Sequence, residues 1–141
     1  MKLELKRIQL HFKLSEETPA YTANLYINGV LTAHLSNSGH GGGDNIHLKN
    51  PKYTELFYTR ILAHYKTLLA FETWCHGLVW DDYSKKQLKK LLNKKIVGMI
   101  EDSVYYIKAP GKTLQEVQDY YPEYTILNLL PFDKAWELYH V

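Results

Sequence analysis

The sequence has little cysteine, no long apolar run and almost no excess charge. Its one cysteine, Cys75, cannot form an internal disulfide, and this fits a reducing compartment. The apolar runs are far shorter than a membrane span, and the first residues lack the apolar core of a secretory signal. A net charge of +2 argues against nucleic acid or a membrane surface as the partner. We therefore expect a cytoplasmic protein.

Established catalytic motifs are also missing. No lysine follows the glycines as in a Walker A loop, and their spacing does not match a dinucleotide-binding fingerprint. The run from His40 to Gly43 matches an oxyanion-hole motif of lipases, but no Gly-x-Ser-x-Gly nucleophile elbow accompanies it. Cys75 and His76 are adjacent, and adjacent residues on a helix point in different directions, so they form no catalytic pair. We expect no cofactor and favour a binding protein over an enzyme.

The glycines of the sequence are concentrated in one short stretch. Four of the eight glycines lie in residues 36–47, a polar stretch expected to form a loop. Ordering such a loop costs conformational entropy, so a ligand or packing must compensate. Glycine-rich turns present backbone N–H groups that bind anions, and a helix start follows at Pro51. We predict a pocket for a phosphate-bearing small molecule, with the binding residues Asn37, Gly39, His40, Gly41, Gly42, Gly43, His47, Lys86 and Lys90.

Two alternatives use the same stretch differently. The first is a protein that binds and inhibits a host protein, since twelve tyrosines suit an interface. The second is a small metal-dependent hydrolase, because His40, Asp44 and His47 carry ligand types that zinc prefers. The lysines from 85 to 95 either contact phosphate or form the solvated face of a helix. A tyrosine-rich surface also suits symmetric self-association, so we expect a homo-oligomer.

The hydrophobic pattern predicts an α+β fold in a single domain, residues 1–141. An N-terminal antiparallel meander is packed by a long helix, and a small C-terminal β-hairpin and helix unit follows. Residues 2–14 alternate as a strand, and either a bulge near Lys6-Arg7 or a frayed start would explain a shift in the apolar phase.

A hairpin is predicted around Asn28-Gly29. A two-residue loop would pair Ile27 with Val30, whereas a three-residue loop with a bulge pairs Leu25 with Leu31. We choose the three-residue loop because it makes one face wholly apolar. It leaves His34 on the opposite face.

Capping signals delimit the predicted helices. Asn50 and Pro51 begin a long helix that ends with Gly77, and Asp82 or Ser84 begins a second helix to Lys94. Strands are predicted over 96–100 and 103–109. A capping box at Thr113 starts a third helix, a short strand covers 124–129, and Pro131 opens the last helix.

Several segments together resemble a known group. The first third contains Ser15-Glu16-Glu17-Thr18, Leu25-Tyr26-Ile27-Asn28-Gly29 and Asn37-x-Gly39-His40-Gly41-Gly42, and the tail contains residues 126–132, Ile-Leu-Asn-Leu-Leu-Pro-Phe. This pattern is similar to that of small phage- and plasmid-encoded proteins of unassigned function. The resemblance implies an accessory protein in a bacterial host cytoplasm. Proteins in that setting counter host defence by binding a protein or by sequestering a nucleotide signal.

Overall fold

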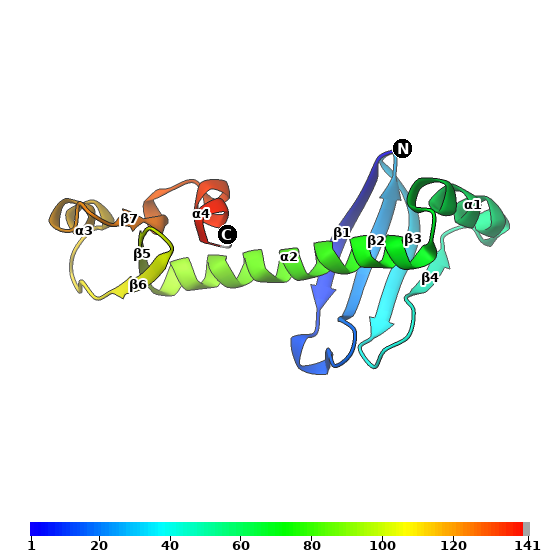
Figure 1. Ribbon diagram of the computed structural model, residues 1–141, viewed down its shortest axis with the longest axis horizontal. Helices are drawn as coiled ribbons and strands as arrows, with labels where there is room; N and C mark the ends of the chain where they lie inside the picture. Colours follow the sequence, from blue (N-terminus) through cyan, green and yellow to red (C-terminus); the bar gives the residue numbers. More distant parts are fainter. Residues whose placement is uncertain (140–141) are drawn as a thin grey trace. The chain divides into compact units, whose positions relative to one another are not determined.

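The structure, a computed structural model, describes residues 1–139. Their contacts divide the chain into two compact units, Met1–Tyr83 and the part from Ser84 onward. The predicted α+β fold is confirmed: a four-stranded antiparallel sheet is followed by a long helix and then by a small sheet with helices (Figure 1). The single-domain expectation stays a prediction.

The first unit is built on one meander. Strands β1 (Leu3–Leu10), β2 (Ala20–Ile27), β3 (Val30–Ser38) and β4 (Asn45–Leu48) pair in chain order. A short 3₁₀ turn, η1 (Phe12–Leu14), follows β1. Because side chains alternate across a strand, the sheet has an apolar inner face and a polar outer face. The buried inner-face residues are Tyr21, Ala23, Leu25, Ile27, Ala33 and Leu35.

Of the two explanations for the phase shift in the first strand, the bulge is confirmed. The pairing of β1 with β2 shifts between Lys6 and Gln9, and Arg7 has a φ of +52°. A bulge changes which face the following residues occupy. For this reason Leu5 before it and Ile8 after it both pack on the inner-face core.

The predicted hairpin loop is wrong, although the apolar face is right. Asn28 and Gly29 both have positive φ, of 49° and 79°, and Ile27 pairs with Val30. This is the two-residue turn whose twist matches the strands, and Asn-Gly is the sequence that favours it. A register shift next to Leu25 then places that residue opposite Ala33 rather than Leu31. The Asn-Gly sequence therefore determines the length of the loop, and the shift in strand pairing brings the apolar side chains back onto one face.

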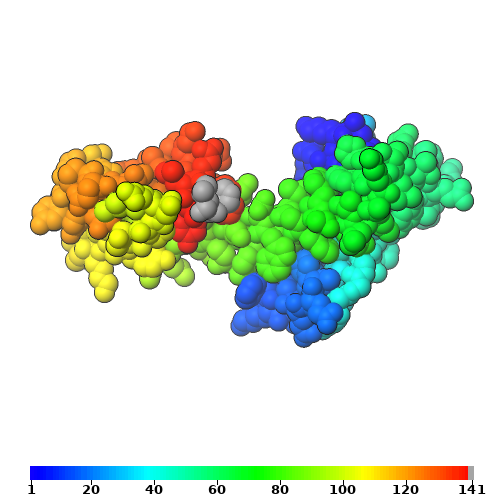
Figure 2. Space-filling model, in the orientation of Figure 1, coloured from blue at the N-terminus to red at the C-terminus, as the bar shows by residue number. Residues whose placement is uncertain are grey.

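Helices α1 (Thr54–Tyr65) and α2 (Leu68–Lys94) follow a 3₁₀ turn, η2 (Pro51–Tyr53), that Asn50 caps as predicted. Phe57 and Ile61 of α1 and Phe71, Cys75 and Val79 of α2 join the inner-face core. Figure 2 views the molecule from the side of α2, whose atoms cover the middle of the sheet. No helix within residues 1–139 is long and apolar enough to cross a membrane.

The predicted division between the two helices is wrong. The break lies at Lys66, which has a φ of +66°, and the Thr67 hydroxyl accepts a hydrogen bond from the Ala70 N–H at 3.1 Å. The helix then continues through Gly77. Glycine inside a helix costs about 1 kcal/mol. Burial of a side chain such as Phe71 or Val79 contributes about 1.5–3 kcal/mol each, so packing on both sides of Gly77 keeps the helix intact.

The second unit is a smaller sheet with two short helices. Its elements are β5 (Ile96–Ile100), β6 (Ser103–Ile107), α3 (Leu114–Tyr120), β7 (Thr125–Ile126), the 3₁₀ turn η3 (Leu127–Leu129) and α4 (Phe132–Tyr139). The strand order is β6-β5-β7. The predicted hairpin, the capping box at Thr113 and the final helix are confirmed. The predicted strand over 124–129 is shorter and ends in η3.

Asn128 ties the end of α2 to this sheet. Its side-chain amide donates to the carbonyls of Leu92 and Lys95, at 2.8 Å each, and its oxygen accepts from the Val97 N–H. One side chain thus satisfies two carbonyls at the end of the helix, groups that a helix end otherwise leaves without partners, and one N–H of β5.

Two glycines, each with open space where a Cβ atom would lie, allow a matched stability test. Gly77→Ala is expected to stabilise the fold by about 1 kcal/mol, because the residue is helical and exposed. Gly42→Ala is expected to destabilise it by about 1 kcal/mol, because its φ is +82°. Urea unfolding of both variants measures the two effects. Equal effects of the same sign would contradict the continuous helix.

Candidate functional site

The glycine-rich stretch is a tight turn rather than a long loop. Strand β3 continues to Ser38 and β4 begins at Asn45, so only residues 39–44 connect them. Strand β4 was not predicted, because its four residues are too few to show a clear alternation. Gly39, Gly41 and Gly42 have φ values of 90°, 89° and 82°, so the turn needs glycine at each.

The buried side chain of Asn37 stabilises this turn through hydrogen bonds. It is only 6% exposed. Its side-chain oxygen accepts hydrogen bonds from the Thr18 hydroxyl at 2.7 Å and the Gly39 N–H at 2.9 Å. Its amide nitrogen donates to the Gly42 carbonyl at 3.4 Å and to Asp44 at 3.0 Å. The side chain therefore uses both its acceptor and its donors within the protein.

Asp44 lies at the centre of a buried polar cluster. Its side chain is 0% exposed. One carboxylate oxygen accepts from the Asn37 amide and from Nε2 of His76 at 2.8 Å, and the other accepts from the Tyr21 hydroxyl at 2.7 Å. A buried carboxylate without such donors would cost several kcal/mol. Three donors from β2, β3 and α2 make the burial tolerable and join these elements to the turn.

Burial and this carboxylate also determine the protonation of its neighbours. The pKa of Tyr21 is raised far above its ordinary value, first by burial and then by the hydrogen bond to Asp44. Burial, followed by the charges of Asp44 and Glu72, raises the pKa of the Cys75 thiol. Cys75 is a free, buried cysteine, and a thiolate nucleophile at this position is disfavoured.

The turn offers a phosphate few free donors. The Gly39 N–H is bound by Asn37, the Gly41 N–H by the Thr18 hydroxyl at 3.3 Å, and the Asp44 N–H by Glu72 at 3.1 Å. Carboxylates also approach it closely. A Cβ on Gly41 would lie 2.5 Å from a Glu17 oxygen, and one on Gly43 would lie 3.0 Å from a Glu72 oxygen. An anion here would displace these partners and meet negative charge.

The three residues of the metal alternative are not brought together. His40 is exposed and its Nδ1 lies 3.1 Å from Glu16, Asp44 is buried against His76, and His47 pairs with His34 across β3 and β4. Within residues 1–139, no group of three or more His, Cys, Asp or Glu side chains could hold a metal ion.

The lysines predicted to contact phosphate belong to the second unit. Lys86 and Lys90 are exposed on α2. Their neighbours pack on aromatic rings of α4, with the Lys85 ammonium 5.7 Å from the Trp136 ring and that of Lys89 4.9 Å from the Phe132 ring. Part of this basic face therefore contributes to packing.

A different polar site lies on the outer face of the first sheet. A shallow hollow of about 420 Å³ is found there. Across the strands, Lys6 lies opposite Asn24, Asn24 opposite His34, and His34 opposite His47. No carboxylate lines the hollow. Its lining residues are Arg7, Gln9, Thr22, Ala23, Asn24, His34, Leu35, Ser36 and His47.

Two features of this hollow favour the binding of an anion. Arg7 is the bulge residue, and bulges commonly re-aim a side chain next to a binding site. Nδ1 of His34 lies 2.7 Å from the Asn24 side-chain oxygen, an acceptor, so Nδ1 donates to it, and a protonated ring would present an Nε2–H donor to a ligand. In the described part of the chain, neither Arg7 nor His47 forms a side-chain hydrogen bond or ion pair.

Of the predicted binding residues, His47 alone lines this hollow. A bulge was predicted near Arg7, and His34 was predicted on the outer face, but whether both line one hollow depends on strand register. The expected bulge in β1, read together with the two histidines of β3 and β4, was the available signal. No protein-family model, curated protein or solved structure matches the chain.

The Asp44 cluster makes a direct stability prediction. Tyr21→Phe removes one donor from a fully buried carboxylate and is expected to lower the free energy of unfolding by about 1–3 kcal/mol. Tyr26→Phe is the matched control, since Tyr26 lies on the outer face with Lys6 over its ring. Chemical denaturation compares the two, and an equal loss in both would contradict the proposed role of Asp44.

Proposed function

We propose that this protein binds a phosphate-bearing small molecule on the outer face of its N-terminal sheet. The observation that carries the proposal is a hollow lined by Arg7, His34 and His47 and by no carboxylate. The ligand class is the one expected from the sequence, but the proposed position is the sheet face instead of the glycine turn.

Arg7 is the main charge of this site. Its guanidinium stays protonated at all working pH values and matches a phosphate with two parallel hydrogen bonds. Because no side chain within residues 1–139 pairs with it, binding would not require an existing ion pair to break. Desolvation of one surface arginine is therefore the main electrostatic cost.

The remaining lining groups can complete the coordination. Nε2 of His34 and the ring of His47 donate when protonated, and the Thr22 and Ser36 hydroxyls donate at any pH. The volume of about 420 Å³ falls within the usual range of small-molecule sites, about 300–1,000 Å³. That volume can hold more than one phosphate group, so a nucleotide is a suitable ligand.

The biological setting stays a prediction. The resemblance to phage accessory proteins favours sequestration of a nucleotide signal of host defence, and sequestration requires binding without turnover. The pairing of Asp44 with His76 inside the core uses this carboxylate for packing, and no carboxylate lines the outer hollow.

One separate observation supports the protein-binding alternative. Phe12, 56% exposed, stacks on Tyr83 at 5.3 Å between ring centroids, and Trp80, 37% exposed, packs edge-on against both. Clustered exposed aromatic side chains are typical of protein interfaces. If this alternative holds, Phe12→Ser abolishes capture of the partner while leaving phosphate binding unchanged.

Calorimetric titration with pyrophosphate and with ADP tests the proposal. Arg7→Gln is expected to weaken binding about tenfold or more, since a charge-assisted hydrogen bond contributes about 1.5–3 kcal/mol. Lys13→Gln, which also removes one exposed positive charge, is expected to change binding little. Raising the salt concentration weakens binding to the native protein.

A variant of the glycine turn distinguishes binding at the outer hollow from binding at the turn. His40→Ala leaves the outer hollow intact and is expected to retain binding. Loss of binding in His40→Ala, together with full binding in Arg7→Gln, would show that the ligand binds at the glycine turn and would overturn the proposal.

A further inference from the structure

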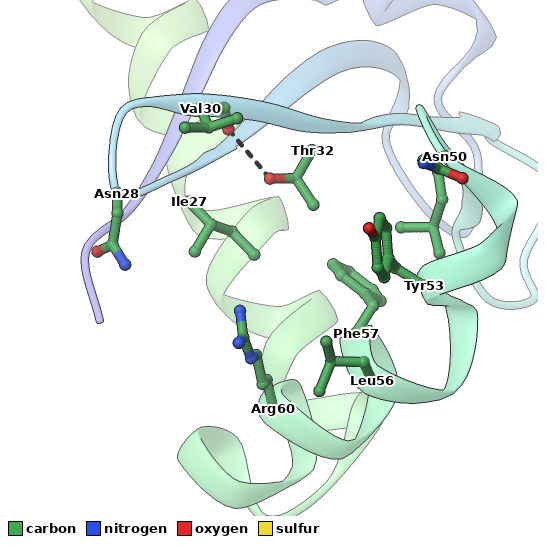
Figure 3. A pocket seen from close by; sticks show the side chains of 10 residues that line it. Ile27, Asn28, Val30, Thr32, Asn50, Tyr53, Leu56, Phe57 and Arg60 are labelled. Carbon is green, nitrogen blue, oxygen red and sulfur yellow. Dashed lines mark hydrogen bonds between the residues drawn. The ribbon is translucent and has the colours of Figure 1, made fainter.

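A second cavity, of about 530 Å³, lies in the first unit between the tip of the β2–β3 hairpin and the first turns of α1. Most of its lining is apolar. Figure 3 shows Ile27 and Val30 on the hairpin side, and Tyr53, Leu56 and Phe57 on the helix side. The other lining residues are Asn28, Thr32, Leu48, Asn50 and Arg60.

Apolar side chains remain exposed around this cavity. Val30 is 65% exposed, Tyr53 54% and Leu56 46%, while Phe57 forms a buried part of the wall at 4%. When an apolar ligand covers exposed apolar groups on one concave surface, binding is stabilised by about 25 cal/mol per Å² of apolar surface removed from water. The cavity therefore favours a ligand with a substantial hydrocarbon part.

The acceptors in the lining are mostly used within the protein. The Asn28 side-chain oxygen accepts from the Lys2 N–H at 2.9 Å, and that of Asn50 accepts from the Lys52 N–H at 3.2 Å. The Thr32 hydroxyl donates to the Val30 carbonyl at 3.0 Å. What remains for a ligand is a set of donors, led by the Arg60 guanidinium.

Arg60 is the one charged residue in the lining. Figure 3 shows its side chain extending from α1 toward Ile27. Among residues 1–139, no carboxylate forms an ion pair with it. The chain contains only two arginines, and each lines a cavity without an acidic residue. A cation beside an apolar wall is complementary to an anion that carries an apolar tail.

We propose that this cavity binds a small aliphatic carboxylic acid, with its carboxylate on Arg60 and its chain against Val30, Leu56 and Phe57. A guanidinium matches a carboxylate with two parallel hydrogen bonds. The chain would cover apolar side chains that are otherwise exposed. This site is independent of the phosphate-binding hollow, so either proposal can fail without the other.

Three ligands of equal chain length test the proposal: octanoate, octanol and octylammonium, each below its aggregation concentration. Binding is followed by calorimetry and by methyl NMR signals of Val30 and Leu56. Octanoate is expected to bind at one site and to shift both signals. Octanol is expected to bind about tenfold more weakly, and octylammonium is expected not to bind.

Arg60→Gln identifies the charge responsible. Because Arg60 is exposed, the variant is expected to fold normally, as circular dichroism can verify. It should bind octanoate about tenfold more weakly and octanol with unchanged affinity, whereas Lys13→Gln should bind octanoate as the native chain does. Equal binding of all three ligands, no binding of octanoate, or an unchanged octanoate affinity in Arg60→Gln would each overturn the proposal.

Discussion

The buried carboxylate of Asp44 is the constraint on which the first unit depends. Its side chain is fully buried, and it accepts hydrogen bonds from Tyr21 on β2, Asn37 on β3 and His76 on α2. Hydrogen bonds to an ionised group in a low-dielectric interior are strong, and loss of one leaves a costly unsatisfied charge. The glycine turn is therefore fixed by the protein itself. The entropy that its glycines lose is compensated by internal hydrogen bonds, so the turn needs no ligand to be ordered.

This arrangement gives the two faces of the sheet different roles. The inner face carries the core and the Asp44 cluster, and α1 and α2 pack on it. The outer face keeps polar side chains whose hydrogen-bonding groups are partly free, with Arg7 turned out of register by the bulge. The second arginine, Arg60, borders an apolar cavity beside the hairpin tip. We therefore propose that ligands bind where cations have no internal partner, while the internal hydrogen bonds of the glycine-rich segment contribute stability.

Features set by neighbouring residues were predicted well from the sequence. The phase change around Lys6-Arg7 predicted the bulge, and Thr113 with Glu116 predicted the capping box that starts α3. Features set by distant residues were not. Gly77 continues a helix because side chains on both sides of it are buried. The Asp44 cluster joins residues from three elements, and no local pattern pairs Tyr21 with His76. The predicted glycine site rested on composition, which does not reveal that the N–H groups of Gly39, Gly41 and Asp44 already have partners.

The most direct measurement is an NMR titration of the ¹⁵N-labelled protein with pyrophosphate, followed at every assigned amide. We expect the signals of Arg7, His34 and His47 to shift together and to saturate with one affinity. We expect the signals of Gly41, Gly42 and Gly43 to stay in place, because the turn is closed by Asn37, Thr18 and Glu72. Saturable shifts confined to the three glycines, with the outer-face signals unchanged, would contradict the account and place the anion at the turn.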